Sequence, residues 1–207
     1  MDRRGFLIGL PLALSGCAAQ EVWAPDDVVA RAIYRDPGPK HLTLYTMKNI
    51  GSDNGAHSAL LINASQRVMF DPAGAWEQDQ MPERNDVLFG ASPRLEEYYV
   101  SFHARVTYYV VGRKVPVAPE VAEKALNLAL VAGPVSQANC TRFTSRLVRQ
   151  LPGFESVRQT WFPNKLDEDF GKLPGVETTE YREDDDDDKR IAAREIAEEL
   201  RSEQSSP

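Results

Sequence analysis

The segment from His57 to Asn63, whose central residues 59–62 are all apolar, is the feature that most limits how this chain can fold. A strand with one solvated face alternates apolar and polar residues, whereas successive apolar residues are typical of a strand buried on both faces. Val, Met and Phe follow in Arg67–Asp71, and the polar residues 63–66 between the two runs predict a turn. The sequence therefore predicts a buried hairpin over residues 57–71.

Further strands and helices are expected on both sides of this hairpin. Residues 42–47 alternate as a strand, and so do residues from 106 toward 117. Ser92 before Pro93 is a helix start, with Ser as the cap and Pro at the first helical position. A second helix begins at Pro119 and ends near Gly133, and a third covers residues 140–151, where Pro152 follows. The fold class is therefore α+β, with a small antiparallel sheet packed on helices.

The first 16 residues have the layout of an export signal. Arg3 and Arg4 precede the apolar run 6–14, which is shorter than the roughly 20 residues that cross a membrane. The segment Leu14–Cys17 resembles the lipobox of bacterial lipoproteins, which implies cleavage before Cys17 and a lipid on its sulfur. We expect a membrane-anchored protein of the cell envelope that faces the periplasm or the exterior. A plain secretory peptide and an uncleaved anchor are the alternatives, and residues 2–7 also resemble a twin-arginine signal.

Charge divides the remaining 191 of the 207 residues into two parts. Residues 175–207 hold 12 acidic and 5 basic residues, including five consecutive aspartates at 184–188. Such a block repels itself, so we expect an acidic, disordered tail with only a weak amphipathic helix near Ala192, Ile196 and Leu200. Residues 17–174 hold 18 acidic and 17 basic residues. This near-neutral body is expected to form one domain and has no basic surface for a nucleic acid.

Cys140 is the cysteine left without an explanation, because the other cysteine is the expected lipidation site. It stands at a predicted helix start, where unpaired backbone amides and the helix dipole favour a thiolate. A hairpin with its turn near Ala64 would place His57 directly opposite Asp71, with Cβ atoms about 5 Å apart. These three residues predict a triad in which Cys140 attacks a carbonyl, His57 exchanges the proton and Asp71 orients the imidazole.

The same residues resemble a known family. The strand 55–62 around His57, Asp71 on the next strand and the Asn139–Cys140 helix start are similar to the circularly permuted NlpC/P60 branch of the papain-like fold. In that branch the histidine strand precedes the cysteine helix, as it does here. The resemblance covers roughly residues 42–151 and implies a papain-like domain. It also implies a hydrolase or acyltransferase for amide or ester bonds, without a cofactor. Its substrates range from peptidoglycan peptides, which the compartment favours, to lipids.

Each site residue also has a structural interpretation. Cys140 is a possible buried small side chain, His57 a possible core histidine, and Asp71 before Pro72 a possible turn residue. His41 and His103 are expected to be structural or surface residues. Zinc is disfavoured, because no paired ligand spacing joins the histidines with Cys140.

The oxyanion donors and the activity itself are open at this point. The backbone N–H of Cys140 is the natural oxyanion donor, with Asn139, Gln137 or Tyr45 as possible helpers. Trp161 and Phe162 are expected at the core or its rim, with a groove role as the alternative. The competing class of protein is a binding or structural lipoprotein that has kept the fold and lost the chemistry.

Overall fold

A seven-stranded sheet, antiparallel between all neighbouring strands, forms the centre of the described structure. The computed structural model describes residues 19, 21–74, 76 and 79–205. The strands are β1 (His41–Asn49), β2 (Gly55–Asn63), β3 (Arg67–Phe70), β4 (Glu83–Arg84), β5 (Val87–Phe89), β6 (Tyr108–Pro116) and β7 (Glu177–Tyr181). The α+β class is confirmed, and the sheet is larger than expected, because the short strands β4, β5 and β7 carry too few residues to show a pattern.

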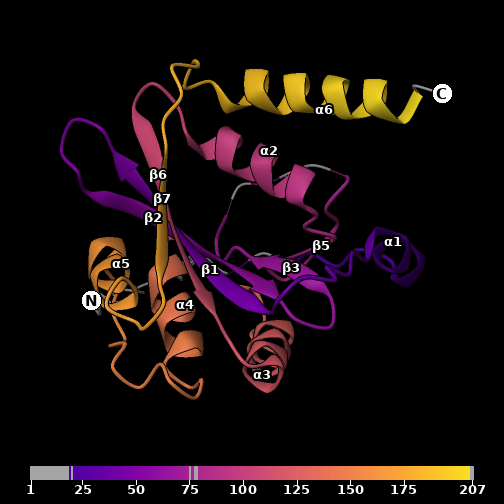
Figure 1. Cartoon of the computed structure of the whole chain (residues 1–207). Coiled ribbons are helices and arrows are strands. Elements are labelled where there is room, and N and C mark those ends of the chain that lie inside the picture. The colour runs from indigo at the N-terminus through magenta and orange to yellow at the C-terminus, as the bar shows by residue number, and fades with distance from the viewer. Residues whose placement is uncertain (1–18, 20, 75, 77–78, 206–207) are drawn as a thin grey trace, which may run out of the picture.

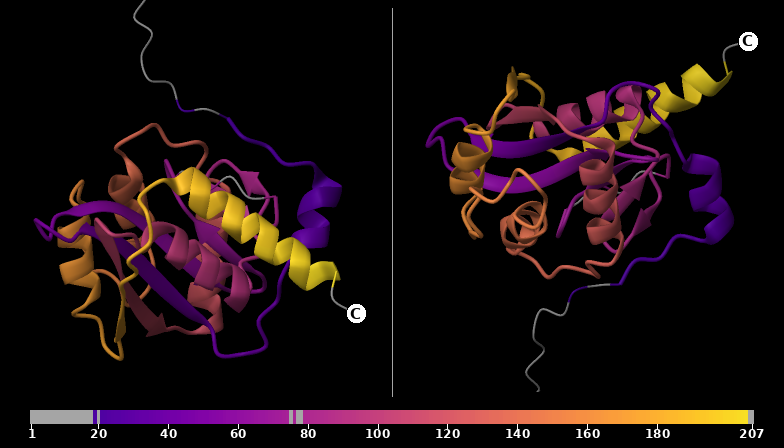
Figure 2. Two further views of the ribbon diagram at one scale, coloured as in Figure 1. Left: turned by 90° about the horizontal axis from the view of Figure 1, so that it is seen from above. Right: turned by 60° about the horizontal axis from the view of Figure 1, so that its bottom comes forward.

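Helices cover both faces of this sheet (Figure 1). The described helices are α1 (Asp26–Ala32), α2 (Pro93–His103), α3 (Pro119–Leu130), α4 (Cys140–Val148), α5 (Pro163–Phe170) and α6 (Lys189–Ser205). One face packs against α3, α4 and α5, and the other against α2 with α6 lying across it, as Figure 2 shows from above. Within the described residues, no helix is both long and apolar enough to span a membrane.

Alternation along β2 builds a separate core on each face. Leu60 and Ile62 are buried toward α3 and α4, while Ala59 and Leu61 are buried toward α2. The apolar run of β2 is therefore explained by burial on both faces, as its sequence predicts. The predicted cap at the start of α2 is also confirmed, because the Ser92 hydroxyl accepts a hydrogen bond from the Leu95 N–H at 3.3 Å.

The predicted hairpin is present, but its register differs from the expected one. Leu60 pairs with Phe70 and Asn63 with Arg67, so the strands are displaced by two residues from a direct pairing of His57 with Asp71. Side chains alternate with a period of two along a strand, so a displacement by two keeps both residues on the same face of the sheet. His57 and Asp71 are therefore diagonal neighbours, which long side chains still bridge.

The acidic segment, where the sequence predicts a disordered tail with a weak amphipathic helix, forms β7 and α6 in the structure. Strand β7 pairs with β6, and α6 buries Ala192, Ile196 and Leu200 against α2. The aspartates are held by residues 105–107: the Asp185 carbonyl accepts from the Val106 N–H, and Asp187 Oδ1 accepts from the Thr107 hydroxyl at 2.8 Å. Charge counting missed this because each of these contacts is made by another part of the chain.

Replacing Ile196 with alanine is expected to destabilise the docking of α6 by about 2 to 3 kcal/mol, since a buried side chain loses most of its contacts. The loss should appear as faster amide hydrogen exchange in α6, with the central strands β1 and β2 unchanged. Glu195→Ala, on the exposed side of the same helix, is the matched control. Equal protection of α6 in both variants would contradict the packing described above.

Candidate active site

The candidate site lies at the part of β2 that has no described strand paired with it on the β3 side. Strand β2 pairs with β3 only from Leu60 to Asn63, because β3 ends at Phe70. The first turn of α4 lies against the free part of this edge, where the Ser58 and Thr141 hydroxyls are 2.9 Å apart. The Ser58 backbone N–H also lowers the pKa of the Cys140 thiol. The early end of β3 therefore lets the start of a helix meet the strand that carries His57.

His57 and Asp71 are hydrogen bonded, with 2.6 Å between His57 Nε2 and Asp71 Oδ1. The Asp71 residue is 3% exposed, whereas the His57 side chain is 17% exposed. Since Asp71 occupies Nε2, Nδ1 is the ring nitrogen left to interact with Cys140, whose pKa His57 lowers. The structure therefore brings together the three residues that the sequence selects, Cys140, His57 and Asp71.

The loop after β3 fixes the Asp71 carboxylate. The Asp71 backbone makes the turn: its N–H donates to the Asp86 carbonyl at 2.8 Å, and its carbonyl accepts from the Gly74 N–H at 2.9 Å. The side chain is left to bind His57, so the turn and the imidazole contact use different atoms of Asp71. A Cβ added at Gly74 would lie 1.9 Å from Asp71 Oδ2, so this close approach requires glycine.

Replacing Gly74 with alanine is therefore expected to displace the Asp71 carboxylate from His57. We expect alkylation of Cys140 to slow about tenfold and stability to fall by about 1 to 3 kcal/mol, because the added methyl group overpacks the loop. Rates of iodoacetamide labelling and thermal unfolding measure the two effects. Gly51→Ala is the control, since its added Cβ meets only Asn49 Oδ1 at an ordinary 3.5 Å. Equal labelling rates in both variants would refute this role of Gly74.

Asp86 connects the Asp71 loop to the segment that precedes Cys140. Its carboxylate accepts from the Ala73 N–H at 2.8 Å and from the Val135 N–H at 2.7 Å. Burial raises the pKa of Asp86, while these two backbone donors lower it. Asp86 is therefore a positioning residue that the sequence analysis missed, because its partners lie on loops far apart in the chain.

The electrostatics of the site favour a thiolate and an imidazolium. Burial lowers the pKa of His57, but the charge and hydrogen bond of Asp71, with a smaller contribution from Cys140, outweigh it and raise that pKa to about 10. Burial raises the pKa of Cys140, but the hydrogen bond and charge of His57, with the Ser58 N–H and the Thr141 hydroxyl, bring it down to about 7. Between these values the pair exists as Cys140 thiolate and His57 imidazolium.

His103 lies beside this pair and is buried, so of the structural and surface roles expected for it the surface one is excluded. It ends α2, is buried, and stacks on His57 with 6.1 Å between ring centroids. Burial lowers its pKa to about 3 and outweighs the nearby Asp71 charge, so the ring is neutral at physiological pH. The neutral ring donates from Nδ1 to the Tyr99 carbonyl at 2.8 Å. His103 is a second residue of the site that sequence reasoning missed. His41, in contrast, is structural: it lies at the first residue of β1, and its Nδ1 contacts the Pro39 carbonyl.

Two of the three proposed oxyanion helpers, Asn139 and Tyr45, have other hydrogen-bond partners in the structure. The Asn139 amide donates to the Ser136 hydroxyl and to the Gln137 carbonyl, and the Tyr45 hydroxyl donates to Glu96. Gln137 is exposed on the loop before α4. The Cys140 N–H belongs to the first turn of α4, where backbone amides have no acceptor within the helix. It is therefore the best-placed oxyanion donor of the four.

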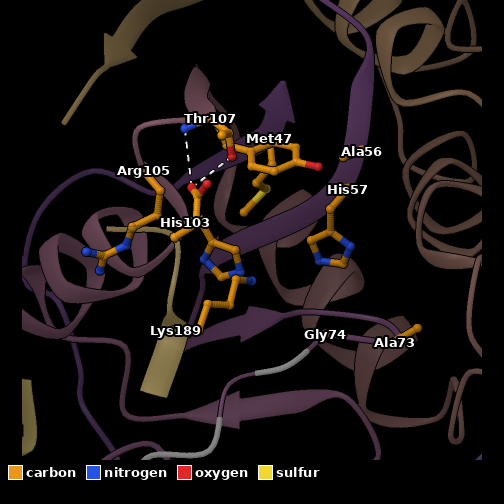
Figure 3. A pocket seen from close by; sticks show the side chains of 11 residues that line it. Met47, Ala56, His57, Ala73, Gly74, His103, Arg105, Thr107 and Lys189 are labelled. Atoms are coloured by element: carbon orange, nitrogen blue, oxygen red, sulfur yellow. Dashed lines mark hydrogen bonds between the residues drawn. The ribbon is translucent and has the colours of Figure 1, made fainter. Parts of the chain in front are cut away.

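A cavity of about 400 Å³ opens next to His57 on the α2 side of the sheet (Figure 3). His57 and Ala56 come from β2, Gly74 from the Asp71 loop, His103 from α2, and Lys189 from α6. The walls thus combine His57, the one member of the triad among the described lining residues, with Lys189 of α6.

Trp161 and Phe162 lie outside this cavity lining and are exposed, at 55% and 68%. They are therefore not core residues, and Trp161 is covered in part by the Arg142 guanidinium, 4.7 Å from its ring centroid. Across the described ranges, no group of three His, Cys, Asp or Glu side chains is arranged as metal ligands.

Cys17 and the signal residues 1–16 lie outside the described residues, so their expected processing stays a prediction. This chain matches no protein-family model, no curated protein and no solved structure. The site is therefore identified by the geometry and charge of Cys140, His57 and Asp71.

Proposed function

We propose that this protein is an envelope lipoprotein whose Cys140 is the nucleophile of a hydrolase or acyltransferase acting on amide or ester bonds. The observations that carry the proposal are the 2.6 Å hydrogen bond between His57 and the buried Asp71 and the mutual effect of His57 and Cys140, which raises the pKa of His57 and lowers that of Cys140. A merely structural cysteine has no need of an imidazole that is itself fixed by a buried carboxylate. The papain-like, permuted NlpC/P60 relationship is part of this proposal, and the order of the His57 strand and the Cys140 helix along the chain supports it.

The reaction follows from the protonation states. The Cys140 thiolate attacks the carbonyl carbon, and the resulting oxyanion accepts a hydrogen bond from the Cys140 N–H. His57 then gives its proton to the leaving amine or alkoxide as the bond to carbon breaks, which leaves a thioester on Cys140. Water or another acceptor gives a proton to His57, attacks the thioester, and releases the product and the thiolate. Asp71 holds the ring and stabilises the imidazolium throughout.

A peptide substrate is favoured over a lipid. The cavity beside His57 has an apolar part with Met47 and Ala56, and its Lys189 ammonium suits a polar or anionic group better than a long acyl chain. An expected lipid on Cys17 would hold the protein at a membrane of the envelope, within reach of cell-wall peptides. These features favour a peptidoglycan peptide as the substrate.

The test is a screen of purified peptidoglycan fragments beside a lipid ester, with mass spectrometry of the products. We expect new amine termini from the peptide fragments with the wild type, and none with Cys140→Ala. Release of fatty acid alone would move the assignment to a lipid ester. A wild type that binds fragments without cleaving them would instead indicate the binding or structural lipoprotein.

A further inference from the structure

Lys189 places an ammonium group in the cavity beside His57. It is the first residue of α6, and Figure 3 shows its side chain next to the His103 ring. Its Nζ lies 4.9 Å from the centroid of the Phe102 ring, and such a cation–π contact fixes an ammonium without using its N–H donors. Among the residues that the structure describes, no ion pair or hydrogen bond to this ammonium is found. Its three donors are therefore available to a ligand.

The other charged groups of the cavity already have partners. Arg105 Nη1 is 3.5 Å from Asp185 Oδ2, and Arg105 Nε donates to the Phe102 carbonyl. Asp187 Oδ1 accepts from both the N–H and the hydroxyl of Thr107, as the dashed lines of Figure 3 mark. Lys189 is thus the cation of this cavity whose charge the protein leaves unpaired, within the part of the chain described.

The surroundings of Lys189 suit a single negative charge. The Asp187 carboxylate also lines the cavity, and the buried Asp71 carboxylate acts electrostatically on Lys189. A phosphate dianion would be repelled by both acids, whereas a carboxylate brings one charge and a planar pair of acceptors. Lys189 and His57 line the same cavity, whereas Cys140 is not among its described lining residues, so a substrate that reacts at Cys140 must extend past His57 for Lys189 to bind it.

We propose that Lys189 is a specificity-determining residue that binds a carboxylate of the substrate in this cavity. The proposal rests on the proposed thiol chemistry of Cys140, and it narrows the substrate to a peptide with a free carboxylate close to the scissile bond. The carboxylate would replace part of the water around the exposed Lys189 residue and accept a charge-assisted hydrogen bond from its ammonium.

The test uses matched electrophiles that read Cys140 directly. N-iodoacetylglycine carries a carboxylate where N-iodoacetylglycinamide carries a neutral amide, and the two probes are otherwise identical. A second pair, longer by one methylene, varies the distance between the reactive carbon and the carboxylate or amide. The measured quantity is the ratio of the two alkylation rate constants, acid over amide. We expect Lys189→Gln to lower this ratio about tenfold for at least one pair, as the loss of a charge-assisted hydrogen bond requires. Lys189→Arg should retain most of it.

Arg190→Gln is the matched control, because Arg190 pairs with Asp188 and its side chain is exposed. Its ratio should equal that of the wild type. An unchanged ratio in Lys189→Gln would overturn the role of Lys189 while leaving rapid labelling of Cys140, and thus the proposed function, intact. Wild-type labelling no faster than a free thiol with every probe would overturn both. A phosphonate analogue of the acid probe that depends more strongly on Lys189 would overturn the carboxylate assignment in favour of a phosphate-bearing ligand.

Discussion

Replacing Cys140 with alanine is expected to reduce turnover at least about 1,000-fold, since no other group at the site replaces a lost nucleophile. The fold should persist, because Cys140 is 8% exposed at the start of α4 and only one sulfur atom is removed. Product formation from the active substrate of the screen measures the loss, and thermal unfolding verifies the fold. Turnover within tenfold of the wild type would show that the chemistry lies elsewhere.

A serine variant sharpens this prediction. Cys140→Ser keeps a hydroxyl beside His57 and the N-terminal position in α4, so it preserves packing better than alanine does. Its hydroxyl ionises far less readily than the thiol, and His57 does not bring it to a neutral pKa. The serine variant should therefore be nearly as inactive as the alanine variant. Full activity of Cys140→Ser would contradict a thiolate mechanism.

Replacing Asp71 with asparagine is expected to lower kcat/KM at pH 7 by about 100-fold to 1,000-fold, because the orienting carboxylate of a triad is lost. The Asp71 charge raises the pKa of His57, so the neutral amide should let that pKa fall. Without an imidazolium beside it, the pKa of Cys140 should rise toward its ordinary value. The pH range in which the thiolate and imidazolium coexist therefore narrows from both sides.

A second buried aspartate separates this effect from simple destabilisation. Asp169 is 5% exposed and accepts hydrogen bonds from Arg158 at 2.8 and 2.9 Å, away from the triad. Asp169→Asn should lower the free energy of unfolding and leave the pH profile of turnover unchanged. If Asp71→Asn also left that profile unchanged, Asp71 would be a structural residue only.

The contact between His57 and Asp71 was predictable from the sequence because it requires only that both side chains point to the same face of the sheet. The polar residues 63–66 locate the turn of the hairpin, and any error of two residues keeps both side chains on one face. The helix start at Cys140 was predictable in the same way, from a local apolar pattern followed by Pro152. Local signals were thus enough to select the three residues, but not to give their distances.

The rest of the site depends on contacts between distant segments. Asp86 bonds Ala73 and Val135, and His103 stacks on His57 from the end of a helix; neither contact has a signature in the local sequence. Strand β7 was missed because its residues are exposed and only pairing with β6 orders them. The position of Lys189 in the cavity was also missed. It depends on the docking of α6, whose few buried apolar residues are spaced along a segment dominated by acidic residues.

The pH dependence of Cys140 alkylation by iodoacetamide tests the central claim most directly. A neutral probe reports the thiolate, so the wild-type rate should rise through pH about 7 and stay level toward pH about 10, where His57 loses its proton. In His57→Ala the rise should move up to about 8.5 or higher, the range of an ordinary thiol. A wild-type profile that rises only with that of an ordinary thiol, and coincides with the His57→Ala profile, would contradict the thiolate and imidazolium pair.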